Sequence, residues 1–354
     1  MNILADASLP GLIEAFPPPF KLTLYHHLND VSTHLAGQDI LVCRSTLKVT
    51  KELLSGHSLR YVATASSGTD HIDELFLKDK KIQLFDAKGS NAHAVADYVL
   101  ASVAYLQTYH GVTGQNAGII GLGAVGSKVA ARLRALNFKI TAYDPPKSQR
   151  DNTFQSASLK ELAQCDLICI HANLHDDLPY PSRNLIAEPI LSQLKPNTAI
   201  INASRGGIVN EEALLKLATP IFYCADVFSH EPTINPDIVN FACLCTPHIA
   251  GHTIEAKYNA VILISQKIHH SLNLPEPTYA ALPVAQSSNY HSSQRWQDYI
   301  LSLFNPVNET KSLKTALDKT ESFLQLRKAH QYRHDFRAQQ APEDAFLKAL
   351  LGLP

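Results

Sequence analysis

The sequence lacks the features that mark several large classes of protein. Its 354 residues carry a formal net charge of only −1, which argues against a protein that binds nucleic acid through a basic surface. No apolar stretch approaches the roughly 20 residues of a membrane-spanning helix. The amino terminus has no basic segment followed by a long apolar run. We therefore expect a cytoplasmic protein with no membrane and no nucleic-acid partner.

The six cysteines also lack the paired spacing of zinc or redox motifs. They fall mostly within apolar stretches such as DLICIHA and FACLCTP, so we expect reduced core residues. The composition, 45% hydrophobic and 18% charged, is ordinary for a globular protein of two or three domains.

Short apolar segments rich in Val, Ile and Tyr alternate with helical patterns along most of the chain. This alternation predicts βαβ units and a parallel sheet. Strands are expected at 39–43, 60–65, 81–87, 115–121, 138–144, 166–172, 198–204 and 221–227. Helices are expected at 91–109, 124–136, 158–164, 210–218 and 254–272. The regular rhythm from residue 115 onward predicts a doubly wound, Rossmann-type α/β sheet.

The carboxyl-terminal part differs in character. Proline and serine accumulate at 273–289 as in a linker. Beyond it, Leu313, Leu317 and Leu324 roughly follow one helical stripe, which favours a packing or dimerisation appendage over a solvated helical tail. The arginines of this tail are interpreted as solvated helical charges, with a basic lip beside a neighbouring subunit's site as the alternative: Arg327, Arg333 and Arg337.

A glycine pattern, GLGAVG, opens the helix that follows the strand at 115–121. Gly121 permits the tight turn, Gly123 lets the backbone approach a pyrophosphate, and Gly126 lets the helix pack closely on the strand. Asp144 ends the next strand, near the spacing of the acid that binds an adenosine ribose. A carboxylate there would repel a 2′-phosphate, so the sequence predicts NAD rather than NADP. The alternatives are a turn without a ligand and an Asp144 that only ends its strand.

Three polar residues follow apolar segments predicted as strands of this sheet, at the edge where open α/β sheets bind ligands: Arg205 after 198–204, Glu231 after 221–227 and His248 after ACLCTP at 242–247. Arg205 can grip a carboxylate through two parallel hydrogen bonds. His248 can accept the hydroxyl proton of an alcohol that is oxidised, because imidazole titrates near neutral pH. Glu231 can orient and charge-stabilise that imidazole. Taken singly, these residues could be a surface arginine, a solvated glutamate and a core histidine.

His248 and His252 stand four positions apart in TPHIAGH, a spacing that on a helix would suit a metal site. Pro247 and Gly251 instead favour a loop, so the two rings need not share a face. We expect no metal.

Several stretches together resemble the D-2-hydroxyacid dehydrogenase family: GLGAVG, YDPP, NASRGGIVNEEAL, ADVFSHEP and TPHIAG, over residues 1 to about 280. The resemblance implies a Rossmann-type NAD domain at 94–251 and a discontinuous, flavodoxin-like substrate domain at 1–93 and 252–283. It also implies a small carboxyl-terminal dimerisation domain at 284–354 and a homodimer. Substrate and nicotinamide would meet between the two main domains.

The resemblance also implies roles for individual residues. Arg205, Glu231 and His248 would be the catalytic residues. Contacts with NAD are implied for Gly121, Gly123, Ala124, Val125, Gly126, Asp144, Ala172, Asp226 and Gly251. Contacts with the substrate are implied for Ser45, Ser66, Ser67, Gly68 and His252. Arg44 is our own candidate for binding a phosphate, with a surface arginine as the alternative.

The sequence departs from the family at two of these positions. Ala172 and Asn173 replace the usual Thr-Pro, so a hydroxyl contact with the cofactor is missing. His252 stands where the nearest subgroup usually has a tyrosine that contacts substrate.

The chain resembles that subgroup in five stretches: ILADASLP, VCRSTLKVTKELL, ASSGTDHIDE, YDPPKSQRD and FLQLRKAHQYRHDF. The subgroup acts on a small phosphorylated 2-hydroxy acid. We therefore expect NAD-dependent oxidation of such an acid at C2. Two alternatives remain. One is the same chemistry on 3-phosphoglycerate, glycerate or another small 2-hydroxy acid. The other is a non-catalytic, NAD-sensing binding protein with this fold.

Overall fold

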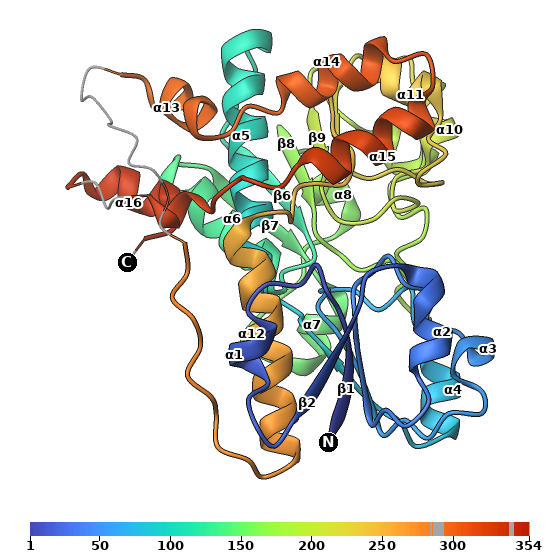
Figure 1. The fold of residues 1–354 in the computed structure, drawn as a ribbon. Helices are drawn as coiled ribbons and strands as arrows, with labels where there is room; N and C mark the ends of the chain where they lie inside the picture. The colour runs from blue at the N-terminus through green and yellow to red at the C-terminus, as the bar shows by residue number, and fades with distance from the viewer. Residues whose placement is uncertain (284, 286–293, 340–342, 354) are drawn as a thin grey trace. The chain divides into compact units, whose positions relative to one another are not determined.

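The computed structural model describes residues 1–283, 285, 294–339 and 343–353. The chain divides into two compact units, each built on a parallel sheet of its own (Figure 1). Unit 1 comprises Met1–Asn91 and Thr253–Val284, and unit 2 comprises Ala92–His252 and Ala285–Pro354. The expected linker at 273–289 lies partly outside the described residues.

Unit 1 has a five-stranded sheet in the order β2-β1-β3-β4-β5. The strands are β1 (Asn2–Asp6), β2 (Lys21–Tyr25), β3 (Ile40–Cys43), β4 (Tyr61–Thr64) and β5 (Gln83–Asp86). The shorter helical segments are α1 (Leu12–Ala15), η1 (Leu28–Asp30), α2 (Val31–His34), α3 (Lys51–Leu54) and α4 (Glu74–Asp79). Every residue of β3 and β4 is buried, as expected for central parallel strands covered on both faces.

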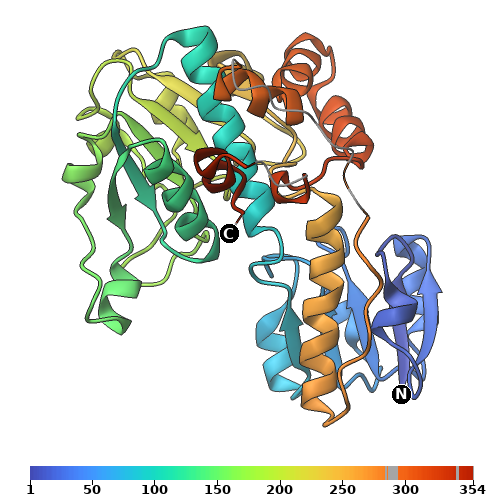
Figure 2. The same ribbon diagram turned by 90° about the vertical axis from the view of Figure 1, so that its left-hand side faces the viewer.

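Helix α12 (Ile254–Ser271) brings a distant part of the sequence back to this sheet, as the orange helix of Figure 2 shows. Its apolar residues Ala260, Ile264 and Ile268 recur every four positions and pack on one face of the sheet. On the other face Val31, Leu54, Leu77 and their neighbours from the short helices form a separate cluster.

Unit 2 has a six-stranded sheet in the order β11-β10-β9-β8-β6-β7. The strands are β6 (Asn116–Ile120), β7 (Lys139–Tyr143), β8 (Leu167–Ile170), β9 (Ala199–Asn202), β10 (Phe222–Ala225) and β11 (Leu244–Cys245). Its helices up to β11 are α5 (Ala92–His110), α6 (Ala124–Ala135), α7 (Pro145–Arg150), α8 (Leu159–Leu162), α9 (Glu188–Leu191), α10 (Glu211–Leu215) and α11 (Pro236–Phe241). The strand order reverses at β6, which creates the switch point where doubly wound sheets bind ligands.

The carboxyl-terminal helices lie in unit 2 with this sheet. They are α13 (Trp296–Leu303), α14 (Val307–Thr315), α15 (Lys319–Ala329), η2 (Phe336–Ala338) and α16 (Ala345–Leu351). α13 packs on α5, α16 on α6, and α14 beside the edge strand β11. The Thr310 hydroxyl accepts a hydrogen bond from the Cys245 N–H at 3.0 Å and donates one to the Cys245 carbonyl at 2.9 Å. The tail thus satisfies backbone groups that an edge strand leaves unpaired.

The predicted leucine stripe of the tail is wrong. Leu313 is buried, but Leu317 is fully exposed between α14 and α15, and Leu324 is 48% exposed. Asp318 caps α15 by accepting from the Glu321 N–H at 2.9 Å, so a new helix starts there with a new phase. Phe323 is the residue of α15 that enters the core.

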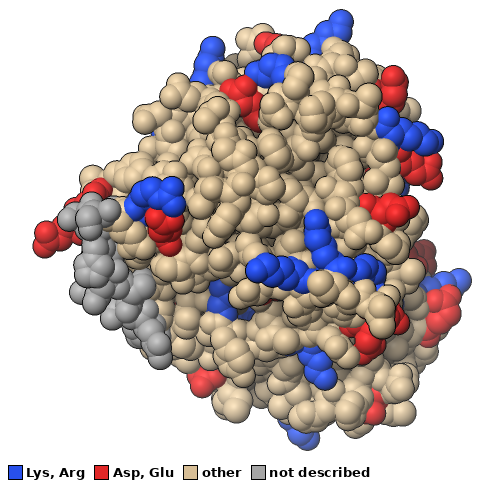
Figure 3. Space-filling view, turned by 90° about the horizontal axis from the view of Figure 1, so that it is seen from above, with Lys and Arg blue, Asp and Glu red and all other residues tan. Residues whose placement is uncertain are grey.

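In the part of the chain that the structure describes, no helix is long and apolar enough to cross a membrane. The face in Figure 3 intersperses Lys and Arg with Asp and Glu on a largely uncharged surface, in keeping with the nearly balanced net charge.

Candidate active site

The carboxyl ends of the unit 2 strands carry most of the predicted residues. The glycine loop follows β6, Asp144 follows β7, Ala172 follows β8 and Arg205 follows β9. Asp226 and Glu231 follow β10, and His248 follows β11. Because these strands are all parallel, the residues lie along one edge of the sheet.

In the glycine loop, Gly121 and Gly126 pack against neighbouring backbone, whereas Gly123 has open space beside it. Gly121 has φ 85°, and a Cβ there would lie 2.7 Å from the backbone nitrogen of Ala172. A Cβ on Gly126 would lie 2.0 Å from the Gly121 carbonyl oxygen, whereas one on Gly123 would meet no atom within 4 Å. Gly123 is the N-cap of α6 and makes no side-chain cap, so the first N–H groups of α6 are suited to a pyrophosphate. The loop therefore fits the dinucleotide that the sequence predicts.

Asp144 helps to shape this loop. One carboxylate oxygen accepts from the Leu122 N–H at 2.8 Å, and the other accepts from the Lys147 N–H at 2.9 Å and caps α7. A carboxylate has about four lone-pair sites, so two bonds leave acceptor capacity for ribose hydroxyls.

The imidazole of His248 pairs with Glu231. His248 Nδ1 lies 2.7 Å from Glu231 Oε2, and Glu231 Oε1 accepts from the Phe228 N–H at 2.9 Å. Burial of Glu231 opposes its ionisation, but the charge and hydrogen bond of His248 outweigh that effect and hold the Glu231 pKa below its ordinary value. The contact engages Nδ1, so Nε2 is the ring nitrogen suited to exchange a proton with a substrate.

The loop that carries His248 is held by the buried carboxylate of Asp226. Its oxygens accept from the Thr246 hydroxyl at 2.7 Å and from the N–H groups of Ile249 and Ala250 at 2.8 Å each. Burial raises the Asp226 pKa above its ordinary value, against the lowering influence of the His248 charge and of these bonds. His248 itself has φ 54°, in the left-handed region that residues with side chains seldom adopt. The loop is therefore fixed in a conformation that it would rarely take alone.

Arg205 lies in the turn after β9, close to the loop after β10. Its Nη1 donates to the Ser204 carbonyl at 2.9 Å, and the Asn202 side-chain amide donates to the Arg205 carbonyl at 3.1 Å. A Cβ on Gly206 would lie 1.8 Å from the Phe228 carbonyl oxygen, so the two turns pack backbone against backbone. This close approach brings the turn of Arg205 next to the segment that orients Glu231. Gly206 is therefore a residue of the site that the sequence pattern did not indicate.

The candidate substrate residues of unit 1 follow β3 and β4. The Ser45 N–H donates to Ser66 Oγ at 3.0 Å, and Ser67 Oγ donates to the Asn91 side-chain oxygen at 2.7 Å. Gly68 lies directly after Ser66 and Ser67, in the loop that follows β4.

Arg44 faces an open pocket at the same edge of the unit 1 sheet. Its Nε donates to Asp6 Oδ2 at 2.8 Å, and its side chain is 41% exposed. Burial of Asp6 works against ionisation, but hydrogen bonds from Ser8 and Arg44 prevail and lower the Asp6 pKa. The pocket, of about 410 Å³, is lined by Asp6, Ala7, Ser8, Tyr25, His26, Leu28, Arg44 and Thr46.

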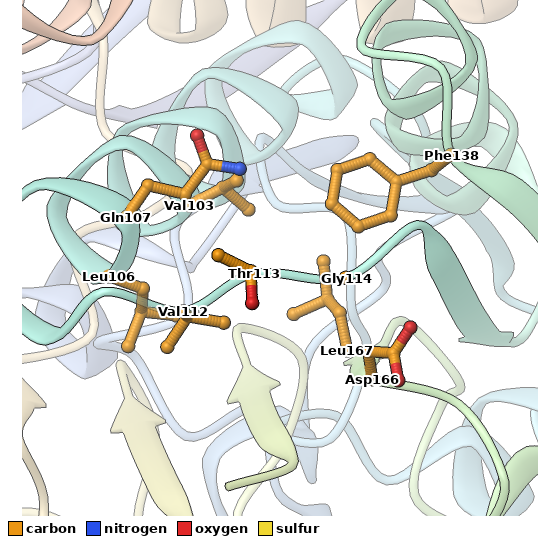
Figure 4. Close-up of a pocket in the computed structure, with 9 residues that line it drawn as sticks. All are labelled: Val103, Leu106, Gln107, Val112, Thr113, Gly114, Phe138, Asp166 and Leu167. Carbon is orange, nitrogen blue, oxygen red and sulfur yellow. The ribbon is translucent and has the colours of Figure 1, made fainter.

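A second cavity lies at the opposite end of the unit 2 strands (Figure 4). Its lining residues are Val103, Leu106, Gln107, Val112, Thr113, Gly114, Phe138, Asp166 and Leu167. Gly114, Phe138 and Asp166 lie just before β6, β7 and β8, at the ends of these strands away from the glycine loop. At about 10 Å³ it has room for one water molecule at most and is not a substrate site.

The backbone of His252 closes a turn between the His248 loop and α12. The N–H of His252 donates to the Ile249 carbonyl at 2.9 Å, in a turn that directly precedes Thr253, the N-cap of α12. No three His, Cys, Asp or Glu side chains gather as metal ligands among the described residues.

The interpretation of Arg333 as a solvated helical charge is wrong: it is only 8% exposed and lies between α15 and η2, outside any helix.

Comparisons with known proteins place this architecture in a family. Residues 93–250 match the model described as "D-isomer specific 2-hydroxyacid dehydrogenase, NAD binding domain". The chain is 54% identical over 336 residues to an erythronate-4-phosphate dehydrogenase of Legionella pneumophila, covering 95% of both chains. It is 33% identical over 345 residues to one of Coxiella burnetii, covering 96% of this chain and 94% of that one.

Solved structures share the fold. The NAD⁺-bound 3-phosphoglycerate dehydrogenase of Entamoeba histolytica superposes with a TM-score of 0.65 at 21% identity, covering 77% of this chain and 95% of that one. The fold and the glycine loop define a dehydrogenase with NAD as its cofactor. The chain belongs to the D-isomer-specific 2-hydroxyacid dehydrogenase family, and the predicted family, α/β fold and cofactor are thereby confirmed.

Proposed function

We propose that the chain oxidises 4-phospho-D-erythronate at C2 to (R)-3-hydroxy-2-oxo-4-phosphooxybutanoate, as a step in pyridoxal 5′-phosphate biosynthesis. The names of the Legionella and Coxiella relatives support this substrate. The observation that carries the chemistry is the 2.7 Å contact between His248 Nδ1 and Glu231 Oε2. It supports a base that is oriented and charge-stabilised for an alcohol oxidation.

In this proposal each residue of the trio has one task. Arg205 binds the substrate carboxylate and so directs the C2 hydrogen. His248 Nε2 accepts the proton of the C2 hydroxyl as the carbonyl forms, and later releases it to solvent. Glu231 holds the ring in the tautomer that leaves Nε2 able to accept, and stabilises the imidazolium that results. Bound NAD⁺ supplies the acceptor for the hydride that leaves C2.

The proposed cofactor contacts lie along the unit 2 sheet edge. Backbone groups of the glycine loop and the start of α6 would bind the pyrophosphate, and Asp144 the adenosine ribose. Ala172, Asp226 and Gly251 would lie beside the nicotinamide half. Since Asp226 already accepts three bonds from its own loop, its main task is to shape the cofactor site.

The proposed substrate contacts of unit 1 are Ser45, Ser66, the backbone of Ser67 and Gly68, and Arg44. Arg44 is our candidate for the 4-phosphate because its guanidinium lines an open pocket and retains donors beyond the one that bonds Asp6. His252 is proposed as a further donor in place of the family's tyrosine.

We also propose a cytoplasmic homodimer formed through the carboxyl-terminal segment. This segment exposes large apolar side chains, among them Leu317 and Tyr332, which are 105% and 85% exposed. Contiguous exposed apolar patches mark contacts between proteins, so these side chains are the candidates for the subunit contact. Light scattering on the full chain tests the proposal, and a monomer at micromolar concentration would contradict it.

The substrate proposal is tested by NADH formation with 4-phospho-D-erythronate, 3-phosphoglycerate and glycerate, with and without a 2-oxo acid as acceptor for bound NADH. We expect kcat/KM to be highest for the phosphoerythronate by at least about tenfold. A preference for phosphoglycerate would overturn the assignment but keep the chemistry. Tight NADH binding with no turnover of any 2-hydroxy acid would instead support an NAD-sensing protein.

A further inference from the structure

Arg333 makes unusual contacts for a residue of a carboxyl-terminal tail. Its Nη2 donates to the carbonyl oxygen of Ala94 at 3.1 Å and also to the carbonyl oxygen of Ala250. Its Cζ lies 4.5 Å from the centre of the Phe304 ring, a cation–π distance. A buried guanidinium loses its hydration, and here the two carbonyls and nearby carboxylates such as Asp97 and Asp335 compensate for that loss.

The two carbonyls belong to functionally placed segments. Ala250 lies two residues after His248 and two before His252, after which the chain passes from unit 2 into unit 1. Ala94 lies in the first turn of α5, just after the chain has entered unit 2 at Ala92. One nitrogen of Arg333 therefore ties together, within unit 2, two segments that lead into unit 1.

The backbone of Ala250 is bonded at both its N–H and its carbonyl. Its N–H donates to Asp226 at 2.8 Å, and its carbonyl accepts from Arg333. The left-handed backbone of His248, with φ 54°, persists only where surrounding bonds enforce it. Asp226 bonds this segment from the loop after β10, and Arg333 bonds it from the tail.

The segment that carries Arg333 is itself anchored to the core of unit 2. Asp97 of α5, which is fully buried, accepts from the Phe336 N–H at 2.8 Å and pairs with Arg132 of α6. The backbone three residues beyond Arg333 is thus bonded to a buried ion pair. These bonds fix the backbone next to Arg333, and so they hold its guanidinium in place beside the His248 loop.

We propose that Arg333 is a positioning residue that, through the Ala250 carbonyl, holds the His248 loop in the arrangement that proton transfer requires. It acts on the backbone and need touch neither substrate nor cofactor. This inference rests on the proposed role of His248 as acid and base. In this proposal the carboxyl-terminal tail supports catalysis at the active site of the same chain.

The test uses the full-length chain with Arg333→Met, which removes the donors and keeps bulk, and Arg333→Lys, which keeps the charge but not the planar fork. We expect kcat to fall roughly 100-fold in R333M and less in R333K, because misplacement of a catalytic group by about 1 Å costs that much. KM for NAD should change less than about threefold, because the glycine loop is elsewhere. Backbone amide exchange at 246–252 should quicken selectively.

A matched control is Leu347→Ala. Leu347 is buried in α16, which packs on α6, and it makes no hydrogen bond to the His248 loop through its apolar side chain. L347A should lower Tm through a core cavity but keep the kcat of the folded enzyme and the exchange pattern at 246–252. This contrast separates a local positioning effect from a general loss of stability.

Near wild-type kcat and exchange in R333M would overturn the inference. Exchange that quickens evenly along the whole chain, with no preference for 246–252, would overturn it as well. If R333M does not fold, R333K decides by the same two readouts. If wild-type enzyme turns over no 2-hydroxy acid, the proposed function fails. The exchange measurement, which needs no substrate, then still tests whether Arg333 holds the loop.

Discussion

Glu231 Oε2 lies 2.7 Å from His248 Nδ1, and the two residues come from loops that follow the neighbouring strands β10 and β11. The pairing is built by the backbone as much as by the side chains. Phe228 donates its N–H to the other oxygen of Glu231, and Asp226 fixes the loop of His248. Loops at one edge of the sheet thus position both the proposed base, His248, and the carboxylate that stabilises its charged form, Glu231.

Removing the charge of Glu231 should shift the pH dependence of the reaction. In Glu231→Gln the imidazolium form of His248 loses its anionic partner and so becomes less favourable relative to the neutral ring. Reduction of the 2-oxo acid, which needs the protonated ring, should then fail at lower pH than in wild type, with kcat at neutral pH reduced about tenfold. Steady-state rates from pH 5 to about 9 measure the shift.

Glu211→Gln is the matched control for this experiment. Glu211 accepts from the Ser229 N–H at 2.9 Å and so supports the same loop, without any bond to His248. Its pH profile should coincide with that of wild type. Coincident profiles for wild type and E231Q would contradict the pairing.

The lowered pKa of Glu231 also predicts a pH-dependent contribution to stability. A carboxyl whose pKa is lower in the folded chain stabilises the fold fully above its unfolded value, near 4.5, and loses that contribution as pH falls through the folded pKa. The difference in free energy of unfolding between wild type and E231Q should therefore be largest above about pH 5 and shrink on acidification. Urea unfolding at several pH values measures it, and a difference that grows toward low pH would refute the sign.

Much of this arrangement could be predicted from sequence because it depends on local pattern. The glycine spacing, the alternation of strand and helix, and polar residues after strands are all local, and unit 2 forms the expected elements in the expected order. The strands β1 and β2 were not among those expected. β2 lies at the sheet edge, where exposed positions interrupt its apolar pattern.

The remainder depends on contacts between distant parts of the sequence, which periodicity does not encode. Arg333 meets Ala94 across 239 positions and Ala250 across 83. A charged residue in a polar stretch reads as solvated, and only the folded chain reveals that backbone carbonyls surround it. The leucine stripe failed for a related reason, because Asp318 restarts the helix and changes which side chains face the core.

Arg205→Lys should separate charge from geometry at the carboxylate site. Lysine keeps the positive charge but cannot form two parallel bonds in one plane. We expect kcat/KM for the 2-hydroxy acid to fall roughly 100-fold, since a hydrogen bond between charged groups contributes about 1.5–3 kcal/mol. NAD affinity, measured by fluorescence titration, should be unchanged. Unaltered kcat/KM in R205K would show that Arg205 does not bind the carboxylate.

Two glycines of the cofactor loop should respond differently to alanine. A Cβ at Gly126 would collide with the Gly121 carbonyl at 2.0 Å, so Gly126→Ala should cost about 1–3 kcal/mol of stability and weaken NAD binding as well. At Gly123 a Cβ meets no protein atom within 4 Å, so Gly123→Ala should keep its Tm and lose only NAD affinity. Thermal unfolding and NAD titration of both variants check this. Equal NAD affinity in G123A and wild type would show that the pyrophosphate does not lie over this residue.

Arg44→Met tests whether the unit 1 pocket recognises a phosphate. If Arg44 binds the 4-phosphate, kcat/KM for 4-phospho-D-erythronate should fall about 10- to 100-fold, while that for unphosphorylated D-erythronate should hardly change. The ratio of the two values is the informative quantity, since damage to the fold lowers both alike. Arg60→Met is the control, because Arg60 precedes β4, at the other end of this sheet, and its guanidinium lies over the Tyr61 ring. An unchanged ratio in R44M would show that Arg44 serves only as the ion-pair partner of Asp6 and that another group binds the phosphate.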